Sequence, residues 1–89
     1  MHYRQLIRRP WHLGTRHLVM LYRIGKAQQA GQRLCAADLD TERLEWTQRL
    51  LDVNLIHIIG SDYMYSLTDE GYEAFETLCA FLDAGGQIL

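Results

Sequence analysis

The spacing of apolar residues along the chain predicts three helices of ordinary length. Apolar side chains recur three and four residues apart in residues 15–30, 41–53 and 69–84, which is the period of a helix with one buried face. Each span has a candidate N-cap at its start and, at its end, a residue that favours the left-handed backbone following a helix. The N-cap candidates are Thr15, Asp40-Thr41 and Thr68, and the terminating residues are Gly31, Asn54 and Gly85-Gly86.

The stretch between the last two of these helices has the pattern of a β-hairpin. Residues 55–59 (LIHII) are apolar and β-branched, residues 60–62 (GSD) favour a turn, and residues 63–67 (YMYSL) form a second strand. Tyr63 and Tyr65 share one face of that strand, so we expect a partly exposed tyrosine pair. Before residue 41 we expect a short extended piece at 32–34 and a short helix at 35–39, which makes the 41–53 helix third in chain order.

The third predicted helix separates into two halves when it is projected at about 100° per residue. The apolar half holds Leu44, Trp46, Thr47, Leu50, Leu51 and Val53, and the polar half holds Glu42, Glu45, Gln48, Arg49 and Asp52. We assign Trp46 to the core of the protein. The polar half carries three acids against Arg49 alone, which gives it a net charge of −2.

Length and composition predict one domain with a modest core, since the 89 residues are 48% hydrophobic. Charge is strongly segregated along the chain. Residues 1–33 hold seven of the nine basic residues and no acid, whereas residues 34–89 hold all eleven acids. The sequence leaves two interpretations open: a basic face that meets a polyanion, or two halves that neutralise each other within the fold.

The chain divides into a basic arm at residues 1–14, a folded domain at 15–85 and a short tail at 86–89. Neither a secretory signal nor an apolar run of membrane-spanning length is apparent, so we expect a cytoplasmic protein that does not enter a membrane. Cys35 and Cys79 lie in apolar stretches, which favours two buried thiols over the alternative of a structural disulfide.

The sequence lacks the motifs that carry catalysis or metal binding. The histidines show neither the H-E-x-x-H spacing nor a cluster with cysteine of the zinc-binding kind; they are His2, His12, His17 and His57. Neither a nucleophile-elbow serine nor a glycine-rich phosphate loop occurs. We therefore expect no enzyme, no metal site and no cofactor.

Residues 50–75, LLDVNLIHIIGSDYMYSLTDEGYEAF, resemble a segment of the winged helix-turn-helix regulators of the MarR-like and PadR-like families. That segment reads L-x-x-x-G-L-I, a strand, a wing turn and then Y-x-L-T-x-x-G. The matching residues here are Leu50, Leu55, Ile56, Tyr65, Leu67, Thr68 and Gly71, and Asn54 stands where glycine is usual. The resemblance covers about residues 15–83. It implies a mainly α fold with a small β-hairpin (α+β), the winged helix-turn-helix.

The resemblance further implies that the third helix enters the major groove of double-stranded DNA and that the wing touches its backbone. Gln48 and Arg49 suit the recognition of adenine and guanine. The residues placed at the DNA are Thr41, Arg43, Glu45, Gln48 and Arg49 on the helix, Ser61 in the wing, and Arg8, Arg9 and Arg16 on the phosphates. The expected function is a small transcriptional regulator that acts by occupying duplex DNA.

The acidic character of the third helix and of the wing keeps a second function open. A net charge of −2 on the polar half opposes phosphate binding, so the alternative is a winged-helix module that binds another protein. Such an inhibitor or adaptor could mimic nucleic acid through its acids. The resemblance also implies a homodimer whose interface holds Phe75, Leu78, Phe81 and Leu82, unless this last helix packs only on its own chain.

Overall fold

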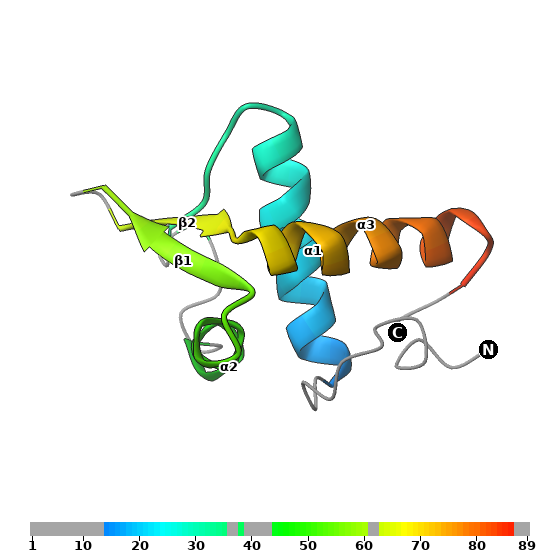
Figure 1. Cartoon of the computed structure of the whole chain (residues 1–89), viewed down its shortest axis with the longest axis horizontal. Helices are drawn as coiled ribbons and strands as arrows, with labels where there is room; N and C mark the ends of the chain where they lie inside the picture. Colours follow the sequence, from blue (N-terminus) through cyan, green and yellow to red (C-terminus); the bar gives the residue numbers. More distant parts are fainter. Residues whose placement is uncertain (1–13, 36–37, 39–43, 61–62, 87–89) are drawn as a thin grey trace.

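The computed structural model describes residues 14–35, 38, 44–60 and 63–86. These residues form three helices and one antiparallel hairpin: α1 (Thr15–Gln29), α2 (Leu44–Asp52), β1 (Ile56–Ile59), β2 (Met64–Leu67) and α3 (Asp69–Asp83). The fold is therefore mixed α+β. Figure 1 shows α1 at the centre, with α3 crossing it and with the hairpin and α2 beside it. Because α1 contacts α2, α3 and β2, it is the element on which the others assemble.

The first turn of α1 uses a cap other than the predicted one. Gly14 is the N-cap and Thr15 is the first helical residue, so the predicted Thr15 cap is wrong by one position. The backbone N–H of Gly14 donates to Nδ1 of His17 over 2.8 Å. His17 thus takes the part that a glutamate or glutamine plays in a capping box, where it satisfies the N–H of the capping residue.

The three described helices all end in the same backbone motif. A residue with positive φ follows each helix: Gly31 (77°), Asn54 (63°) and Gly85 (94°), as the sequence predicted. After α1, the N–H groups of Gly31 and Gln32 donate back to the carbonyl oxygens of Gln28 and Ala27. After α2, the N–H groups of Asn54 and Leu55 donate to the carbonyl oxygens of Leu51 and Leu50. After α3, the N–H groups of Gly85 and Gly86 donate to the carbonyl oxygens of Leu82 and Phe81. This is the Schellman motif, which gives partners to carbonyl groups that the helix end leaves open.

The hairpin is joined to the segment that follows α1. β1 and β2 pair antiparallel, with Ile56 opposite Leu67. On its other side, β2 receives the segment after α1, because the N–H of Tyr65 donates to the carbonyl oxygen of Leu34 over 2.7 Å. Cys35 bridges to Met64 at the same place. Cys35 is therefore extended and does not begin the predicted 35–39 helix, whose residues 36, 37 and 39 lie outside the described residues.

The second strand begins one residue later than predicted. Tyr63 has φ 55° and lies in the turn, 71% exposed, whereas Tyr65 in β2 is only 5% exposed. The predicted exposed tyrosine pair is therefore wrong. A left-handed backbone at Tyr63 removes it from the alternation of faces that a continuous strand would impose.

Thr68 fixes the passage from the hairpin into α3. Its Oγ1 accepts from the N–H of Gly71 over 2.9 Å, which confirms the predicted N-cap, and it donates to the carbonyl oxygen of Asn54 over 2.6 Å. The N–H of Thr68 also donates to the carbonyl oxygen of Leu55 over 3.1 Å. A Cβ on Gly71 would overlap that same Leu55 oxygen, so the start of α3 can approach the end of α2 only with glycine here.

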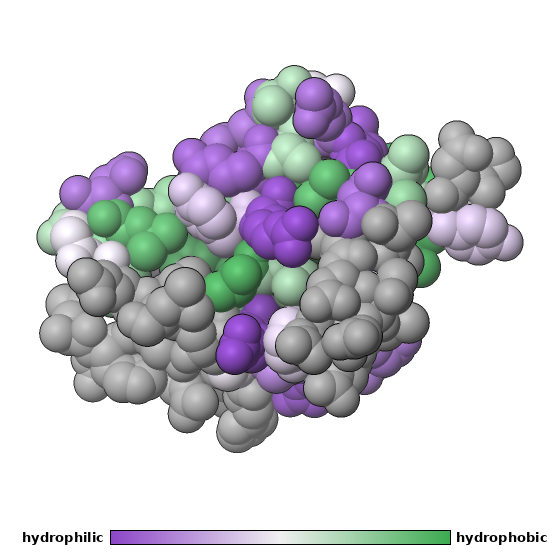
Figure 2. Space-filling model, turned by 180° about the vertical axis from the view of Figure 1, so that it is seen from behind, coloured by the Kyte–Doolittle hydropathy of each residue, from purple (hydrophilic) through white to green (hydrophobic). Residues whose placement is uncertain are grey.

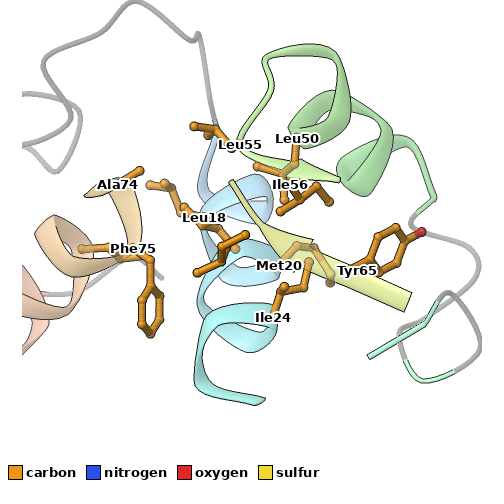
Figure 3. Packing of buried hydrophobic residues seen from close by; sticks show 12 residues of the cluster. Leu18, Met20, Ile24, Leu50, Leu55, Ile56, Tyr65, Ala74 and Phe75 are labelled. Carbon is orange, nitrogen blue, oxygen red and sulfur yellow. The ribbon is translucent and has the colours of Figure 1, made fainter. Parts of the chain in front are cut away.

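The core lies where α1, α2, the hairpin and α3 converge (Figure 3). The largest fully buried side chains are Phe75, Leu18, Leu21, Ile24, Leu50, Leu55, Ile56 and Leu78. Phe75 packs directly on Gly25 of α1, where a Cβ would enter its ring. Burial of about eight such side chains is the main stabilising term for a chain of this size.

Gln28 provides a polar link between α1 and β2. Its Oε1 accepts from the backbone N–H of Leu67 over 2.9 Å and from Oγ of Ser66 over 3.2 Å. Ser66 is 6% exposed, so its hydroxyl has little access to water. The link holds the sheet to the central helix at a place where unpaired polar groups would be costly.

The remaining predictions about the chain have mixed outcomes. Cys35 and Cys79 are free and half-buried, which agrees with two thiols and not with the disulfide. In the described part of the chain, no helix has the length and apolar character that crossing a bilayer requires. The basic arm up to residue 13, the Asp40-Thr41 cap and the tail from residue 87 lie outside the described residues.

Candidate functional site

The outward surface of α2 separates from its core side as the sequence predicted. Thr47 and Leu50 are 3% and 0% exposed, and both face the interior. Gln48 and Asp52 are exposed, and Arg49 is half-buried. The helix itself includes Glu45, whose side chain lies outside the description. The described part of this surface is therefore an amide, a guanidinium and a carboxylate within two turns.

Arg16 brings a positive charge from α1 to this surface. Its guanidinium carbon lies 5.3 Å from the ring centroid of Trp46 on α2, within the range of a cation–π interaction. Arg16 is exposed, so its guanidinium lies at the surface. Arg16, which the resemblance places on the phosphates, therefore lies beside α2.

An open hollow of about 440 Å³ lies between the start of α1 and α2, and its lining is His17, Trp46, Gln48, Arg49 and Asp52. Trp46 provides an apolar wall. The charged lining residues are Arg49 and Asp52. Arg16 lies beside the hollow, because its guanidinium stands over the ring of Trp46. With Arg16 counted, the described charges around the hollow favour an anion over a cation.

Gln48 and Asp52 are joined on the exposed face of α2. Nε2 of Gln48 donates to Oδ1 of Asp52 over 2.9 Å, across one turn of the helix. Side chains four residues apart on a helix face each other, which is why this pair can form. The amide of Gln48 therefore has a defined orientation at the rim of the hollow.

Several predicted contact residues lie outside the description. Thr41 and Arg43 before α2, Ser61 in the hairpin turn, and Arg8 and Arg9 of the arm are among them. Of the predicted set, the structure brings together Arg16, Gln48 and Arg49. Trp46, which the sequence places in the core, packs against the core and also lines the hollow. In the helical projection, Trp46 lies at the boundary between the apolar and polar halves. This position indicates a side chain that can contact both the core and the surface.

Other basic residues gather at the opposite end of α1. Figure 2 shows hydrophilic residues over its upper end, where Lys26 and Arg33 are exposed. Lys26 lies 5.5 Å from the ring centroid of Tyr22. Arg23 points toward the loop before α2, since its Nη2 donates to the carbonyl oxygen of Asp38 over 3.4 Å. Basic charge therefore extends along α1 beyond the hollow.

The four residues predicted at a dimer interface fall into two groups. Phe75 and Leu78 are 0% and 1% exposed and belong to the core of their own chain, so their side chains are not available to a second copy. This part of the prediction is corrected by the packing of α3 on α1. Phe81 and Leu82 are half-buried and pack at the edge of the core, which leaves them partly accessible.

Among the described residues, no group of histidine, cysteine, aspartate and glutamate could hold a metal ion. Asp38 has a lowered pKa because the N–H of Cys35, and then its thiol, donate to the carboxylate. Burial raises the pKa of the Cys79 thiol, which makes it a poor nucleophile. Neither group adds catalytic chemistry to the hollow.

A second hollow, of about 430 Å³, lies at the start of α3. Its lining is Asn54, His57, Leu67, Thr68, Asp69 and Glu70. The oxygen of Thr68 and the N–H of Gly71 already satisfy each other there, and Asp69 and Glu70 complement the helix dipole. Thr68, Asp69 and Glu70 are therefore accounted for by the start of α3.

Comparison with protein-family models, with curated proteins and with solved structures gives no match to this chain.

Proposed function

We propose that this chain is a small winged helix-turn-helix protein that binds duplex DNA through α2 and regulates transcription by occupying its site. The order of elements supports the proposal. A helix, an extended segment paired with β2, a helix, a two-stranded hairpin and a final helix follow one another. The resemblance implies this order with one more short helix at residues 35–39, most of which lie outside the described residues. In this arrangement α2 is the recognition helix and the hairpin is the wing.

The observation that carries the proposal is the position of Arg16 over Trp46, 5.3 Å from the ring centroid. The acids of the third predicted helix oppose phosphate binding unless positive charge from elsewhere lies beside them. Arg16 supplies such charge from α1, next to Arg49 on α2. In the proposed complex, Arg16 holds a phosphate, whereas Gln48 and Arg49 reach base edges in the major groove.

Titration with a duplex of random sequence at low and high salt tests the proposal. We expect binding at low salt that weakens steeply as salt rises, because counterions are released from the phosphates. Arg16→Gln should weaken low-salt binding about three- to tenfold and reduce the salt slope by about one. Arg33→Gln is the matched control, since it removes the same charge from the far end of α1.

Two results would contradict DNA binding, and a third would contradict only the role of Arg16. The first is a wild-type protein that leaves the duplex free at low salt. The second is binding that salt does not affect. The third is an equal loss of affinity in Arg16→Gln and Arg33→Gln, which would remove the assignment of Arg16.

A protein-binding module is the second candidate, and the character of the hairpin favours it. Ile58 is 46% exposed and Tyr63 is 71% exposed, so the described part of the hairpin offers apolar and aromatic surface where a DNA-binding wing carries arginine or lysine. Exposed aromatic side chains are enriched at protein interfaces. If the acids of the third predicted helix also contribute, charge reversal at Glu42 and Glu45 should destroy a protein complex; unchanged binding of every partner would remove the mimicry of nucleic acid by these acids.

We also propose a homodimer, because two-fold symmetry suits a palindromic DNA site. Phe81 and Leu82 at the end of α3 are the described residues that support it, since both are apolar and only half-buried.

A further inference from the structure

The hydrogen bond between Gln48 and Asp52 has a consequence for the choice of base at the proposed DNA site. A carboxylate has no hydrogen to donate, so it can bind only the nitrogen end of the Gln48 amide. The 2.9 Å contact from Nε2 to Oδ1 therefore decides which end of the amide is held. The carbonyl oxygen Oε1 and the second N–H remain available to a ligand.

The Oε1 acceptor and the second N–H donor of Gln48 suit adenine better than the other bases. A glutamine recognises adenine when its oxygen accepts from N6 and its nitrogen donates to N7. A glutamine whose amide rotates freely can also turn its nitrogen toward the acceptors O6 of guanine or O4 of thymine. Holding the nitrogen end at Asp52 limits that rotation. It also reduces the conformational entropy that Gln48 loses when it binds.

Asp52 has an opposite effect on affinity for DNA in general. It is exposed on α2, and its negative charge repels phosphates near the hollow that Arg16 and Arg49 flank. An acid that acted only through its charge would change this affinity without changing the base preference.

We infer that Asp52 is a positioning residue that orients Gln48 toward adenine at the cost of affinity for DNA of any sequence. The inference rests on the proposed function, because it describes how the same surface of α2 selects its site. It predicts two changes of opposite sign in one variant, which distinguishes it from a general effect of charge.

Asp52→Ala and Asp52→Asn separate the two effects. Asp52→Ala removes both the charge and the acceptor, so it should bind a scrambled duplex about two- to fivefold more tightly at low salt. It should also lose about tenfold of its preference for adenine at one position of the site. Asp52→Asn removes the charge but keeps an oxygen that accepts from Gln48, so it should gain affinity and retain the preference.

Asp83→Ala is the matched control for the loss of one negative charge. Asp83 is the last residue of α3, as Asp52 is the last residue of α2, and both are exposed. Figure 1 shows the end of α3 on the opposite side of the molecule from α2. We expect Asp83→Ala to change neither the preference nor the affinity for the scrambled duplex beyond about twofold.

The experiment selects binding sites for the wild type and each variant from a pool of short duplexes with a randomised centre, and titrates each protein with the scrambled duplex. Gln48→Ala is a further variant, which should lose the adenine preference without a comparable gain in affinity. It tests the role of Gln48 even if Asp52→Ala does not fold. An adenine preference in Asp52→Ala equal to that of the wild type overturns the inference and leaves DNA binding intact. A wild type that binds no duplex at low salt overturns both.

Discussion

At the scale of single residues, Gln28 shows how a polar side chain can hold two elements together. It lies on the central helix, and its Oε1 is shared by the Leu67 N–H and the Ser66 hydroxyl. A sequence pattern does not reveal such a link, because its partners lie 38 and 39 residues away. Nothing in the residues around Gln28 distinguishes it from its exposed neighbour Gln29.

Gln28→Ala should therefore destabilise the protein, whereas Gln29→Ala should not. Without Gln28, two donors at β2 lose their acceptor, which costs about 1–3 kcal/mol. Gln29 is exposed, and its replacement should change the free energy of unfolding by less than about 0.5 kcal/mol. Urea unfolding followed by circular dichroism measures both, and equal stabilities of the two variants would show that the link contributes nothing.

Gly71 is the second residue whose role comes from a distant contact. Alanine in place of glycine within a helix usually stabilises it, by about 0.5–1 kcal/mol. At Gly71 we expect the reverse, a loss of about 1–3 kcal/mol, because the new Cβ would overlap the Leu55 carbonyl oxygen. The measurement is the unfolding midpoint in urea. A Gly71→Ala protein as stable as the wild type would mean that α3 can shift away from Leu55 without cost.

At the scale of elements, the ends of the helices were the most predictable feature. Gly31, Asn54 and Gly85 all have the left-handed backbone that the sequence indicated, because few residue types adopt it readily. The N-termini were less regular. Thr68 was predicted correctly, but at α1 a histidine three residues inside the helix accepts from the N–H of Gly14, and the N-cap is Gly14, one position before the predicted Thr15.

The boundary between α2 and β1 gives a prediction at this scale. Asn54→Gly should leave the stability unchanged or slightly higher, since glycine adopts φ 63° without steric cost. Asn54→Ala should lose about 1 kcal/mol, because alanine resists this conformation. Thermal unfolding of the two variants tests the difference. If alanine and glycine are equivalent at position 54, the left-handed turn does not limit the stability of the α2–β1 junction.

The candidate site was only partly predictable from the sequence, for a physical reason. Periodicity assigned Gln48, Arg49 and Asp52 to the outward face of the third predicted helix, because faces repeat within one element. It could not assign neighbours from another element, so the hollow beside His17 and the wall formed by Trp46 were not foreseen. The same limit explains why Phe75 and Leu78 were assigned to a dimer interface: an apolar stripe does not say which surface covers it.

At the scale of the whole molecule, the homodimer that we propose would use the end of α3, where Phe81 and Leu82 are half-buried. If the protein is a dimer, it should sediment at twice the chain mass of 10.4 kDa. Leu82→Glu should then give the mass of one chain, because a carboxylate is not tolerated in an apolar interface. Gln32→Glu at the exposed end of α1 is the control for added charge.

The measurement for this prediction is sedimentation equilibrium, together with an unfolding curve that shows each variant to be folded. A wild type that sediments as one chain at all concentrations contradicts the dimer. A Leu82→Glu protein that keeps twice the chain mass would instead place the interface elsewhere.

The contact of Arg16 with Trp46 also supplies the molecule with its own optical reporter. The sequence has two tryptophans, Trp11 and Trp46, so a Trp11→Phe protein emits from the indole that walls the hollow. The emission of an indole depends on the charges and solvent around its ring, and Arg16 contributes one such charge at 5.3 Å. Any molecule that draws the guanidinium away should change the intensity or wavelength of that fluorescence, so occupancy can be followed in solution without a label.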